Sequence, residues 1–477
     1  MQHPIVTIGL EVHVQLKTQT KLFSPSPASF GDEPNDNMSI IDMGLPGVLP
    51  VLNREAVIFA MILGKALNAT VNTYSSFARK NYFYPDLPKS YQITQDRFPI
   101  ITDGHLMIND KPIRIARAHL EEDAGKSIHT DSDRSTYIDL NRAGRALIEI
   151  VTHPEITSTQ QALLFLKKLH HLVRYTDVCD GNMQNGSFRC DANVSIRYNM
   201  KDPLGTRVEL KNINSFKFVE KAIDYEIQRQ HMLLSQGQKI VQETRLFNES
   251  DGKTYSMRDK ENLADYRYFP DPDLPAIMID ASLLNEAKAR MPVLPEVRLK
   301  ELVDQFDLEL HEAQLLLDQK NNELFFLTAF EQSQTKSARQ LYNLMFGELA
   351  AYMNKHNLTI NEQPLKPQQL ADLADELTNA NISQPMSKAI LKTLWSEPNK
   401  SVSDVIESQG MALINDEDTI IQFIETVKQQ SPQQLEQYRN GKDKLFGYFV
   451  GQVMKLSQGK ANPEKVNHLL KIQLEVS

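Results

Sequence analysis

The strongest constraint on the fold is a strict alternation of apolar and polar side chains in two distant segments. Residues 187–197 contain an apolar set and a polar set that alternate: Phe188, Cys190, Ala192, Val194 and Ile196 against Arg189, Asp191, Asn193, Ser195 and Arg197. Residues 5–16 alternate in the same way, with Glu11 and His13 among the polar residues. Because neighbouring strand residues point to opposite faces, each segment predicts a strand with one buried face and one polar face.

Further elements follow from local signals. A turn at residues 202–205 and a second alternating run at 206–211 predict an antiparallel hairpin, with Glu209 and Lys211 on its polar face. Helices are predicted from Asn53 to about residue 68, over residues 158–175, and from residue 215 to Gly237, because apolar residues recur there at helical spacing between cap residues.

Glycine and proline divide the chain into two parts. Residues 1–293 hold 13 of the 19 glycines and 16 of the 23 prolines. The first part is therefore predicted to be rich in strands and loops, and the part after residue 293 to be mostly helical. The expected fold class is α+β.

Composition excludes several classes of protein. No stretch approaches the roughly 18 apolar residues of a membrane helix, and Glu11 and His13 interrupt the N-terminal apolar run, which argues against a signal peptide. The two cysteines, Cys179 and Cys190, form no metal-binding or disulfide pattern, which suits a reducing cytoplasm. The net charge of −9 argues against a surface that is basic throughout.

Two sets of residues could bind a metal ion. Glu11 and His13 are two residues apart on one strand face, at roughly 7 Å, so they could share a hard divalent cation such as Mg²⁺. The alternative is a solvated strand face. The residues His119 to Asp123 contribute three consecutive acids after a strand-like segment, although such acidic runs are usually solvated.

Glu149 lies in the middle of the apolar run of residues 146–151. A lone carboxylate there needs solvent, a basic partner or a metal, because an unpaired buried charge is costly. Arg142 and Arg145 lie just upstream, so a structural ion pair is as good an interpretation as a metal ligand.

Two other segments could contact nucleotides. Residues 79–91 mix basic and aromatic side chains, which suits stacking on bases but equally suits a rigid loop packed on the core. The segment ending in Gly125, Lys126 and Ser127 resembles a phosphate loop, but Leu120 stands where the pattern needs glycine, so a true P-loop is excluded. Lys126 could still contact phosphate in another geometry.

Nucleophilic hydrolase chemistry is poorly supported. The chain has no nucleophile-elbow or amidase motif, and Cys190 falls on the apolar face of its strand, where a small buried side chain is expected.

The C-terminal residues 437–477 carry seven basic and three acidic residues, a net charge of +4. This segment is either an RNA contact or a solvated helix face.

Several blocks of sequence resemble the GatB family, the B subunits of bacterial glutamine-dependent aspartyl/glutamyl-tRNA amidotransferases. They include IGLEVHVQL, RKNYFYPDLPKSYQITQ, HLEEDAGKS, LNRAGRALIEIV, SFRCDANVSIR and DYRYFPDPDLP, in order along the first part. The tail KDKLFGYFVGQVMKLSQGKANPEKVN is similar to the YqeY-like C-terminal domain of that family. The resemblance therefore extends over essentially the whole chain.

The resemblance implies a strand-rich antiparallel cradle domain at 1–293, an all-helical domain at 294–400 and a YqeY-like tRNA-binding tail at 401–477. It implies a cytoplasmic carbon–nitrogen ligase that works in a heterotrimer with GatA and GatC. ATP and Mg²⁺ would serve to phosphorylate the side-chain carboxylate of misacylated Glu-tRNA(Gln) or Asp-tRNA(Asn). Ammonia delivered from GatA would then form the amide.

Carried over by motif, the resemblance implies roles for individual residues. The metal ligands would be drawn from Glu11, His13, Glu121, Glu122 and Glu149. Catalytic roles fall to Glu11, His13, Glu149 and Lys211. Contacts to nucleotide, phosphate or the acyl end would come from Arg79, Lys80, Lys126, Arg189, Asp191, Asn193 and Glu209. The tRNA contacts of the tail would be Lys442, Lys444, Lys455 and Lys460.

One departure from the family and one alternative function bear on these expectations. Gln184 and Asn185 stand where the family commonly has two glutamates, so no acidic role is expected there. The alternative is a tRNA-binding scaffold whose partners carry all the chemistry. Carboxylates within apolar strands favour the catalytic interpretation, because a scaffold does not need them.

Overall fold

The structure, a computed structural model, describes residues 3–129, 135–259 and 266–475. The chain divides into two compact units, Met1–Pro295 and Glu296–Ser477. Unit 1 combines sheets with helices and unit 2 is helical, which confirms the predicted α+β class. The division into three domains, with boundaries at residues 293 and 400, stays a prediction.

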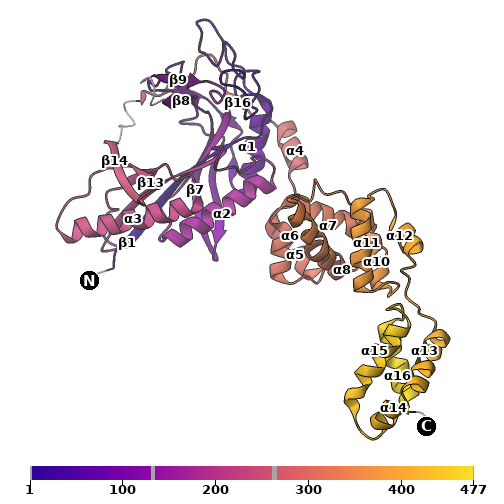
Figure 1. Cartoon of the computed structure of the whole chain (residues 1–477). Coiled ribbons are helices and arrows are strands. Elements are labelled where there is room, and N and C mark those ends of the chain that lie inside the picture. The colour runs from indigo at the N-terminus through magenta and orange to yellow at the C-terminus, as the bar shows by residue number, and fades with distance from the viewer. Residues whose placement is uncertain (1–2, 130–134, 260–265, 476–477) are drawn as a thin grey trace. The chain divides into compact units, whose positions relative to one another are not determined.

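A nine-stranded sheet forms the centre of unit 1 (Figure 1). Its strands in spatial order are β14 (Lys253–Asp259), β13 (Glu243–Asn248), β12 (Val208–Lys211), β11 (Phe188–Arg197), β1 (Ile5–Gln15), β10 (Ala146–Thr152), β7 (Lys111–Glu122), β6 (Ile101–Ile108) and β2 (Thr70–Val71). The predicted strands at 5–16 and 187–197 and the hairpin of β11 with β12 are confirmed. Against the expectation of an antiparallel domain, β12 and β13 pair in parallel, because α3 lies between them in the chain.

Three small sheets accompany the large one. They consist of β15 (Phe269–Pro270), β4 (Ala78–Asn81) and β5 (Tyr91–Thr94); β16 (Ile277–Met278) and β3 (Tyr74–Ser75); and β8 (Lys126–His129) and β9 (Thr136–Asp139). The helices of unit 1 are α1 (Arg54–Ala66), α2 (Thr159–Tyr175), α3 (Phe216–Ser235) and α4 (Ala281–Arg290). The side chains of Asn53, Ser158 and Ser215 cap the first three of these helices, as their sequences predict.

The core of unit 1 lies on one face of the nine-stranded sheet. Alternate residues of β1, among them Leu10 and Val12, are fully buried together with the apolar residues of β11 and of α1, α2 and α3. Figure 1 shows α2 and α3 running across this face. Because strand side chains alternate, packing the apolar set against the helices turns Glu11 and His13 to the other face.

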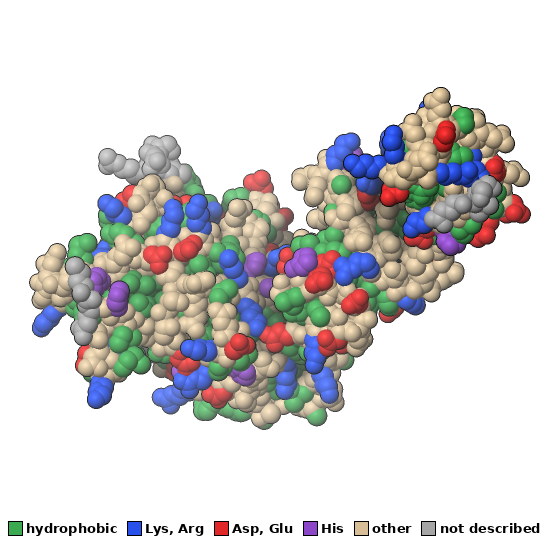
Figure 2. Space-filling model, turned by 90° about the horizontal axis from the view of Figure 1, so that it is seen from below, with side chains coloured by type: hydrophobic (Ala, Val, Ile, Leu, Met, Phe, Trp, Pro, Cys, Tyr) green, Lys and Arg blue, Asp and Glu red, His purple; other side chains and the backbone are tan. Residues whose placement is uncertain are grey.

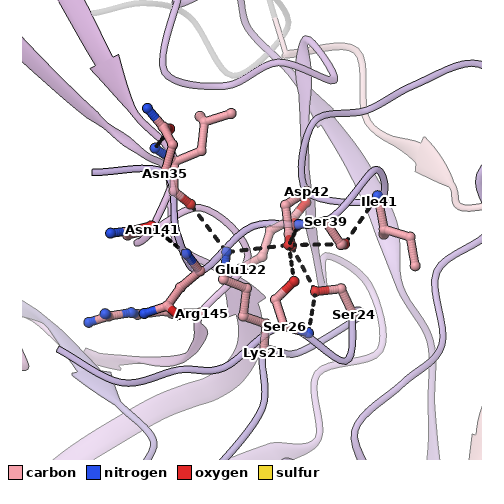
Figure 3. A network of polar contacts seen from close by, with 12 residues as sticks. Lys21, Ser24, Ser26, Asn35, Ser39, Ile41, Asp42, Glu122, Asn141 and Arg145 are labelled. Atoms are coloured by element: carbon pink, nitrogen blue, oxygen red, sulfur yellow. Dashed lines mark hydrogen bonds and ion pairs between the residues drawn. The ribbon is translucent and has the colours of Figure 1, made fainter. Parts of the chain in front are cut away.

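A buried carboxylate organises the irregular segment that connects β1 to α1 (Figure 3). Asp42 accepts hydrogen bonds from the hydroxyls of Ser24 (2.8 Å) and Ser26 (2.7 Å) and from the backbone N–H of Ser39 (2.8 Å). The ammonium group of Lys21 lies 3.4 Å away, and neither charged side chain is more than 3% exposed. This network ties together parts of a segment that has no regular secondary structure of its own.

Among its described residues, unit 2 is helical apart from one isolated β-bridge between Ile414 and Ala461. The helices are α5 (Pro295–Asp304), α6 (Leu310–Leu317), α7 (Lys320–Gln332), α8 (Ala338–Asn343), the π-helix η2 (Leu344–Leu349), α9 (Ala350–His356), α10 (Pro367–Thr378), α11 (Gln384–Ser396), α12 (Val402–Gln409), α13 (Glu417–Gln430), α14 (Pro432–Arg439), the 3₁₀ helix η3 (Asp443–Leu445), α15 (Phe446–Leu456) and α16 (Pro463–Glu475). Phe449, Val453 and Leu470 belong to a separate apolar cluster formed mainly by α13, α15 and α16. Within the described ranges, no helix has the length and apolarity needed to cross a membrane.

Candidate active site

A row of ionisable side chains crosses four adjacent strands on the polar face of the nine-stranded sheet. His13 on β1 lies opposite Arg189 on β11 and, on its other side, opposite Glu149 on β10. Glu149 in turn lies opposite His119 on β7. Directly opposed residues in antiparallel strands have side chains on the same face, so the strand register alone brings these four groups together.

The first cluster in this row, the His13 group, consists of His13, Glu121 and Glu149. Their ligand atoms all lie within 4.8 Å of one another. The His13 Nε2 atom is 3.5 Å from Glu121 Oε1 and 3.8 Å from Glu149 Oε1. The His119 Nε2 atom is 2.9 Å from Glu149 Oε2 and 3.6 Å from Glu121 Oε2. The two carboxylates therefore lie between two imidazole rings.

Electrostatics keeps these carboxylates ionised despite their burial. Burial alone would raise the pKa of Glu149, but the charge and hydrogen bond of His119, with smaller contributions from His13 and Lys80, lower it. Burial alone would lower the pKa of His119, but Glu149 and Glu121 outweigh it and raise that pKa to about 9. The group therefore presents negative charge near neutral pH.

A second cluster, the Glu11 group, lies beside the first and consists of Glu11, Asp191 and Glu209, whose ligand atoms also lie within 4.8 Å of one another. Lys211 forms ion pairs with Asp191 and with Glu209, the latter at 3.2 Å. Thr244 donates a hydrogen bond of 2.8 Å to Glu209. Three carboxylates from three strands thus lie close together, and two of them pair with one ammonium group.

The crowding of carboxylates changes how these groups titrate. Burial, followed by the charges of Glu149 and Glu209, raises the pKa of Glu11, while a hydrogen bond from Asn193 (2.8 Å) opposes the shift. Burial would lower the pKa of Lys211, but Asp191 and Glu209 outweigh it and raise that pKa. Accumulated negative charge of this kind is stabilised by a bound cation, and carboxylate ligands suit a divalent cation of the Mg²⁺ or Mn²⁺ kind.

The structure does not bring all of the predicted metal ligands into one group. Glu122 joins neither group: it points to the face of β7 opposite Glu121, where it pairs with Lys89 and accepts the backbone N–H of Ile93 (2.9 Å). Consecutive strand residues face opposite ways, so Glu121 and Glu122 could not both enter one site. Glu11 belongs with Asp191 and Glu209 rather than with the ligands of the His13 group.

The structure does not show the ion pair that the sequence suggested between Glu149 and Arg142 or Arg145. Arg142 donates to the backbone carbonyls of Ala124 (2.9 Å) and Gly125 (2.6 Å), and Arg145 donates to the carbonyl of Ser29. The partners of Glu149 are the two histidines instead. Sequence proximity suggested the arginines, whereas strand pairing supplies the histidines.

The predicted nucleotide contacts divide into two sets. Near the groups lie Lys80, whose charge acts on Glu149, and Arg189, which lies opposite His13 and is 3.1 Å from Asp123. Arg79 lies apart, because its guanidinium pairs with Asp271 (2.9 Å) and Asp273 (2.7 Å). Lys126 is exposed on β8 and belongs to neither group.

The segment 79–91 is tied to its neighbours and also carries an exposed aromatic ring, and its contact with nucleotides stays a prediction. It is anchored, since the backbone carbonyl of Asp86 accepts the N–H of Gly125 (2.8 Å) and the Asn81 side chain donates to the carbonyl of Tyr266 (2.9 Å). Its Phe83 side chain is 81% exposed, and its Lys80 ammonium lies 4.8 Å from the ring centroid of Tyr266, a residue outside the segment. Lys80 links this segment to the His13 group, because its charge acts on Glu149.

A pocket of about 400 Å³ opens beside the Glu11 group. Its lining includes Glu11, Asn193 and Arg207, so it combines a carboxylate, an amide and a guanidinium. Gly205, from the predicted turn, also lines it, and a Cβ atom there would lie only 2.2 Å from the carbonyl oxygen of Ile196. Only glycine therefore fits at this corner of the pocket.

Sequence reasoning passed over His119 as a site residue. The spacing of His119 and Glu121 could have identified it, because residues two apart share a face if the segment is a strand. The acidic run at 121–123 suggested a solvated segment after the strand, whereas β7 continues through Glu122. Asp123, the partner of Arg189, directly follows β7 and was not among the predicted site residues.

Both cysteines are buried and unpaired. Burial raises the pKa of the Cys179 thiol to about 12, and burial likewise raises that of Cys190. Thiols held protonated in the core are poor nucleophiles. This confirms the expected buried position of Cys190 on the apolar face of its strand.

The chain matches two known protein domains. Residues 6–285 match the family described as the GatB/GatE catalytic domain, and residues 325–474 match the family described as the GatB domain. The first match contains all the strands that carry the His13 group and the Glu11 group. The second contains the four lysines predicted in the tail.

The chain is also similar to full-length proteins that are each named as the B subunit of an aspartyl/glutamyl-tRNA(Asn/Gln) amidotransferase. The protein of Halorhodospira halophila is 48% identical over 475 residues, which cover 98% of this chain and 99% of the relative. That of Nitrosococcus oceani is 47% identical over 472 residues, covering 98% of each chain. That of Coxiella burnetii is 48% identical over 472 residues, covering 98% of this chain and 99% of the relative.

Proposed function

This chain belongs to the GatB/GatE family, and we infer from that premise and from the site that it is the catalytic B subunit of a tRNA-dependent amidotransferase. In the proposed reaction, the side-chain carboxylate of misacylated Glu-tRNA(Gln) or Asp-tRNA(Asn) attacks the γ-phosphorus of ATP, and ADP leaves. Ammonia then displaces phosphate and forms the amide. GatA would supply the ammonia from glutamine, and GatC would complete the heterotrimer, which we place in the cytoplasm.

The observation that carries this proposal is the pair of adjoining acidic groups on one polar sheet face. Phosphoryl transfer needs positioning and charge neutralisation rather than a covalent nucleophile. The site offers carboxylates, imidazoles and ammonium groups, and both thiols among the described residues are buried. A tRNA scaffold would have no use for ionised carboxylates held between two histidines within a sheet.

We assign roles by position. His13, Glu121 and Glu149 would hold a divalent cation, which when bound offsets negative charge on the phosphates. Lys211 would hold Asp191 and Glu209 in place and add positive charge beside them. Lys80 and Arg189 border the His13 group, where their charges would attract and orient phosphate oxygens. The neighbouring pocket would take a polar part of a substrate.

Reconstitution with GatA and GatC tests this function directly. With ATP, glutamine and either misacylated tRNA, the complex should form Gln-tRNA(Gln) or Asn-tRNA(Asn) and release ADP in step with the amide. With this chain and GatA present but ATP omitted, the amide should not form even when ammonium replaces glutamine. Amide formation without ATP, or with GatA and GatC alone, would overturn the proposal.

The tail lysines provide a separate prediction. Lys442, Lys444 and Lys455 are exposed and Lys460 is half-buried, whereas acidic and basic side chains are interspersed over the face of unit 1 seen in Figure 2. Changing all four lysines to glutamine should weaken tRNA binding and lower the slope of log affinity against log salt by about 3 to 4, because fewer counterions are released.

Filter binding or fluorescence anisotropy over a range of salt concentrations measures that slope. A matched variant changes four exposed lysines of unit 1 to glutamine: Lys65, Lys111, Lys167 and Lys201. This control carries the same change in net charge and should leave the slope near that of the wild type. Equal slopes for the tail variant and the wild type would count against a tRNA contact in the tail.

A further inference from the structure

His119 is buried at the base of the His13 group. The residue is 3% exposed, and it lies on β7 directly opposite Glu149 on β10. Its Nε2 atom contacts two carboxylates, while its buried Nδ1 atom has no hydrogen-bond partner among the described residues. Among the described residues, the polar contacts of this ring are therefore those with Glu149 and Glu121.

The two glutamates divide their oxygen atoms between the two histidines. Both Oε2 atoms face His119, at 2.9 Å for Glu149 and 3.6 Å for Glu121. Both Oε1 atoms face His13, at 3.8 Å and 3.5 Å respectively. One oxygen of each carboxylate is thus held from the buried side, and the other is turned toward the more exposed imidazole of His13, whose side chain is 22% exposed.

We propose that His119 is a positioning residue that holds the Glu149 and Glu121 carboxylates so that their Oε1 atoms and His13 Nε2 form the cation-binding side of the group. The inference rests on the proposed function, since it assigns a supporting role within the same site. Metal ligands are commonly oriented by buried hydrogen-bonding partners behind them, and loss of such a partner lowers metal affinity. Burial of His119 leaves little access for water to replace its contacts.

Three substitutions separate positioning from a structural role. Glutamine places its amide N–H near the position of Nε2, whereas asparagine places it near Nδ1. If His119 acts through Nε2, His119→Gln should bind Mn²⁺ within about threefold of the wild type, and His119→Asn and His119→Ala should bind about 10–100-fold more weakly. His105→Ala, on the neighbouring strand β6, is the matched control and should leave the affinity unchanged.

The full-length chain is titrated with Mn²⁺ and followed by electron paramagnetic resonance, with Glu149→Gln defining which binding event belongs to the His13 group. Circular dichroism checks the folding of each variant. If the wild type and Glu149→Gln bind Mn²⁺ alike, the cation site of the proposed function fails. If the wild type binds more tightly than Glu149→Gln but His119→Asn matches the wild type, the positioning role alone fails.

The two conservative variants keep the test decisive. If His119→Gln loses as much affinity as His119→Asn, the ring is needed for its shape rather than for its Nε2 contact, and the inference is overturned. If His119→Asn does not fold, His119→Gln carries the test alone. If His119→Gln binds Mn²⁺ within about threefold of the wild type, the inference is supported, and a loss of affinity greater than about tenfold overturns it.

Discussion

Replacing Glu149 with glutamine is expected to lower ATP-dependent amide formation by about 10²–10³-fold, while glutamine hydrolysis by the complex and tRNA binding stay nearly unchanged. Glutamine keeps the size of the side chain and removes its negative charge. The charge matters because Glu149 lies between His13 and His119 and supplies one of the three ligand atoms of the His13 group. His13→Ala should show the same separation of activities.

The measurement is the rate of amide formation by the reconstituted complex at saturating tRNA, with glutaminase activity and tRNA affinity recorded in parallel. Glu155→Gln is the matched control, because Glu155 lies just after β10 and pairs with Arg114 away from both acidic groups. Undiminished amide formation in both Glu149→Gln and His13→Ala would favour the scaffold alternative. A parallel fall in tRNA affinity would instead indicate misfolding.

Replacing Asp42 with alanine is expected to lower the free energy of unfolding of unit 1 by about 3–5 kcal/mol. The substitution leaves the Lys21 ammonium group buried without its charge partner and removes the acceptor for Ser24, Ser26 and Ser39 (Figure 3). Burial already lowers the pKa of Lys21, and Asp42 is the strongest influence that opposes this shift. Without Asp42, the polar contact left to that ammonium among the described residues is the carbonyl of Leu140 at 3.1 Å.

Urea unfolding is monitored by hydrogen exchange in peptides from β1, which reports on unit 1 separately from unit 2. Asp36→Ala is the control, since Asp36 is an exposed aspartate of the same segment, and it should change stability by less than about 0.5 kcal/mol. The double variant Lys21→Met with Asp42→Ala should recover part of the loss, because it removes the unpaired buried charge. An Asp42→Ala protein within about 1 kcal/mol of the wild type would contradict this account.

Much of the fold was predictable because its signals are local. The alternation at 5–16 and 187–197 predicted β1 and β11. Cap residues that precede apolar residues at helical spacing predicted α1, α2 and α3, and the predicted first residue of each helix lies within one residue of the observed one. The parallel pairing of β12 with β13 was not predictable in this way. It depends on how the chain returns after α3, and no pattern within either strand indicates that path.

The site was predictable in its residue types but not in its groupings. Glu11, His13, Glu121 and Glu149 were all identified as acidic or metal-binding candidates. Their assignment to two separate groups depends on register, because a shift by one residue would turn each strand's polar set to the other face. Lys211 likewise pairs with Asp191 on the neighbouring strand β11, and Arg189 pairs with Asp123, which directly follows β7 and is distant in sequence.

By itself, the sequence determined which side chains share a face, where helices begin, and which family the chain resembles, because these depend on residues near one another or on the order of motifs. Only the tertiary structure decided that Glu149 is held by two histidines rather than by Arg142 or Arg145, that Glu122 pairs with Lys89, and that Arg79 is neutralised by two aspartates. The physical reason is that a charged side chain pairs with whatever the strand register and packing place within a few ångströms, and those partners come from distant parts of the chain.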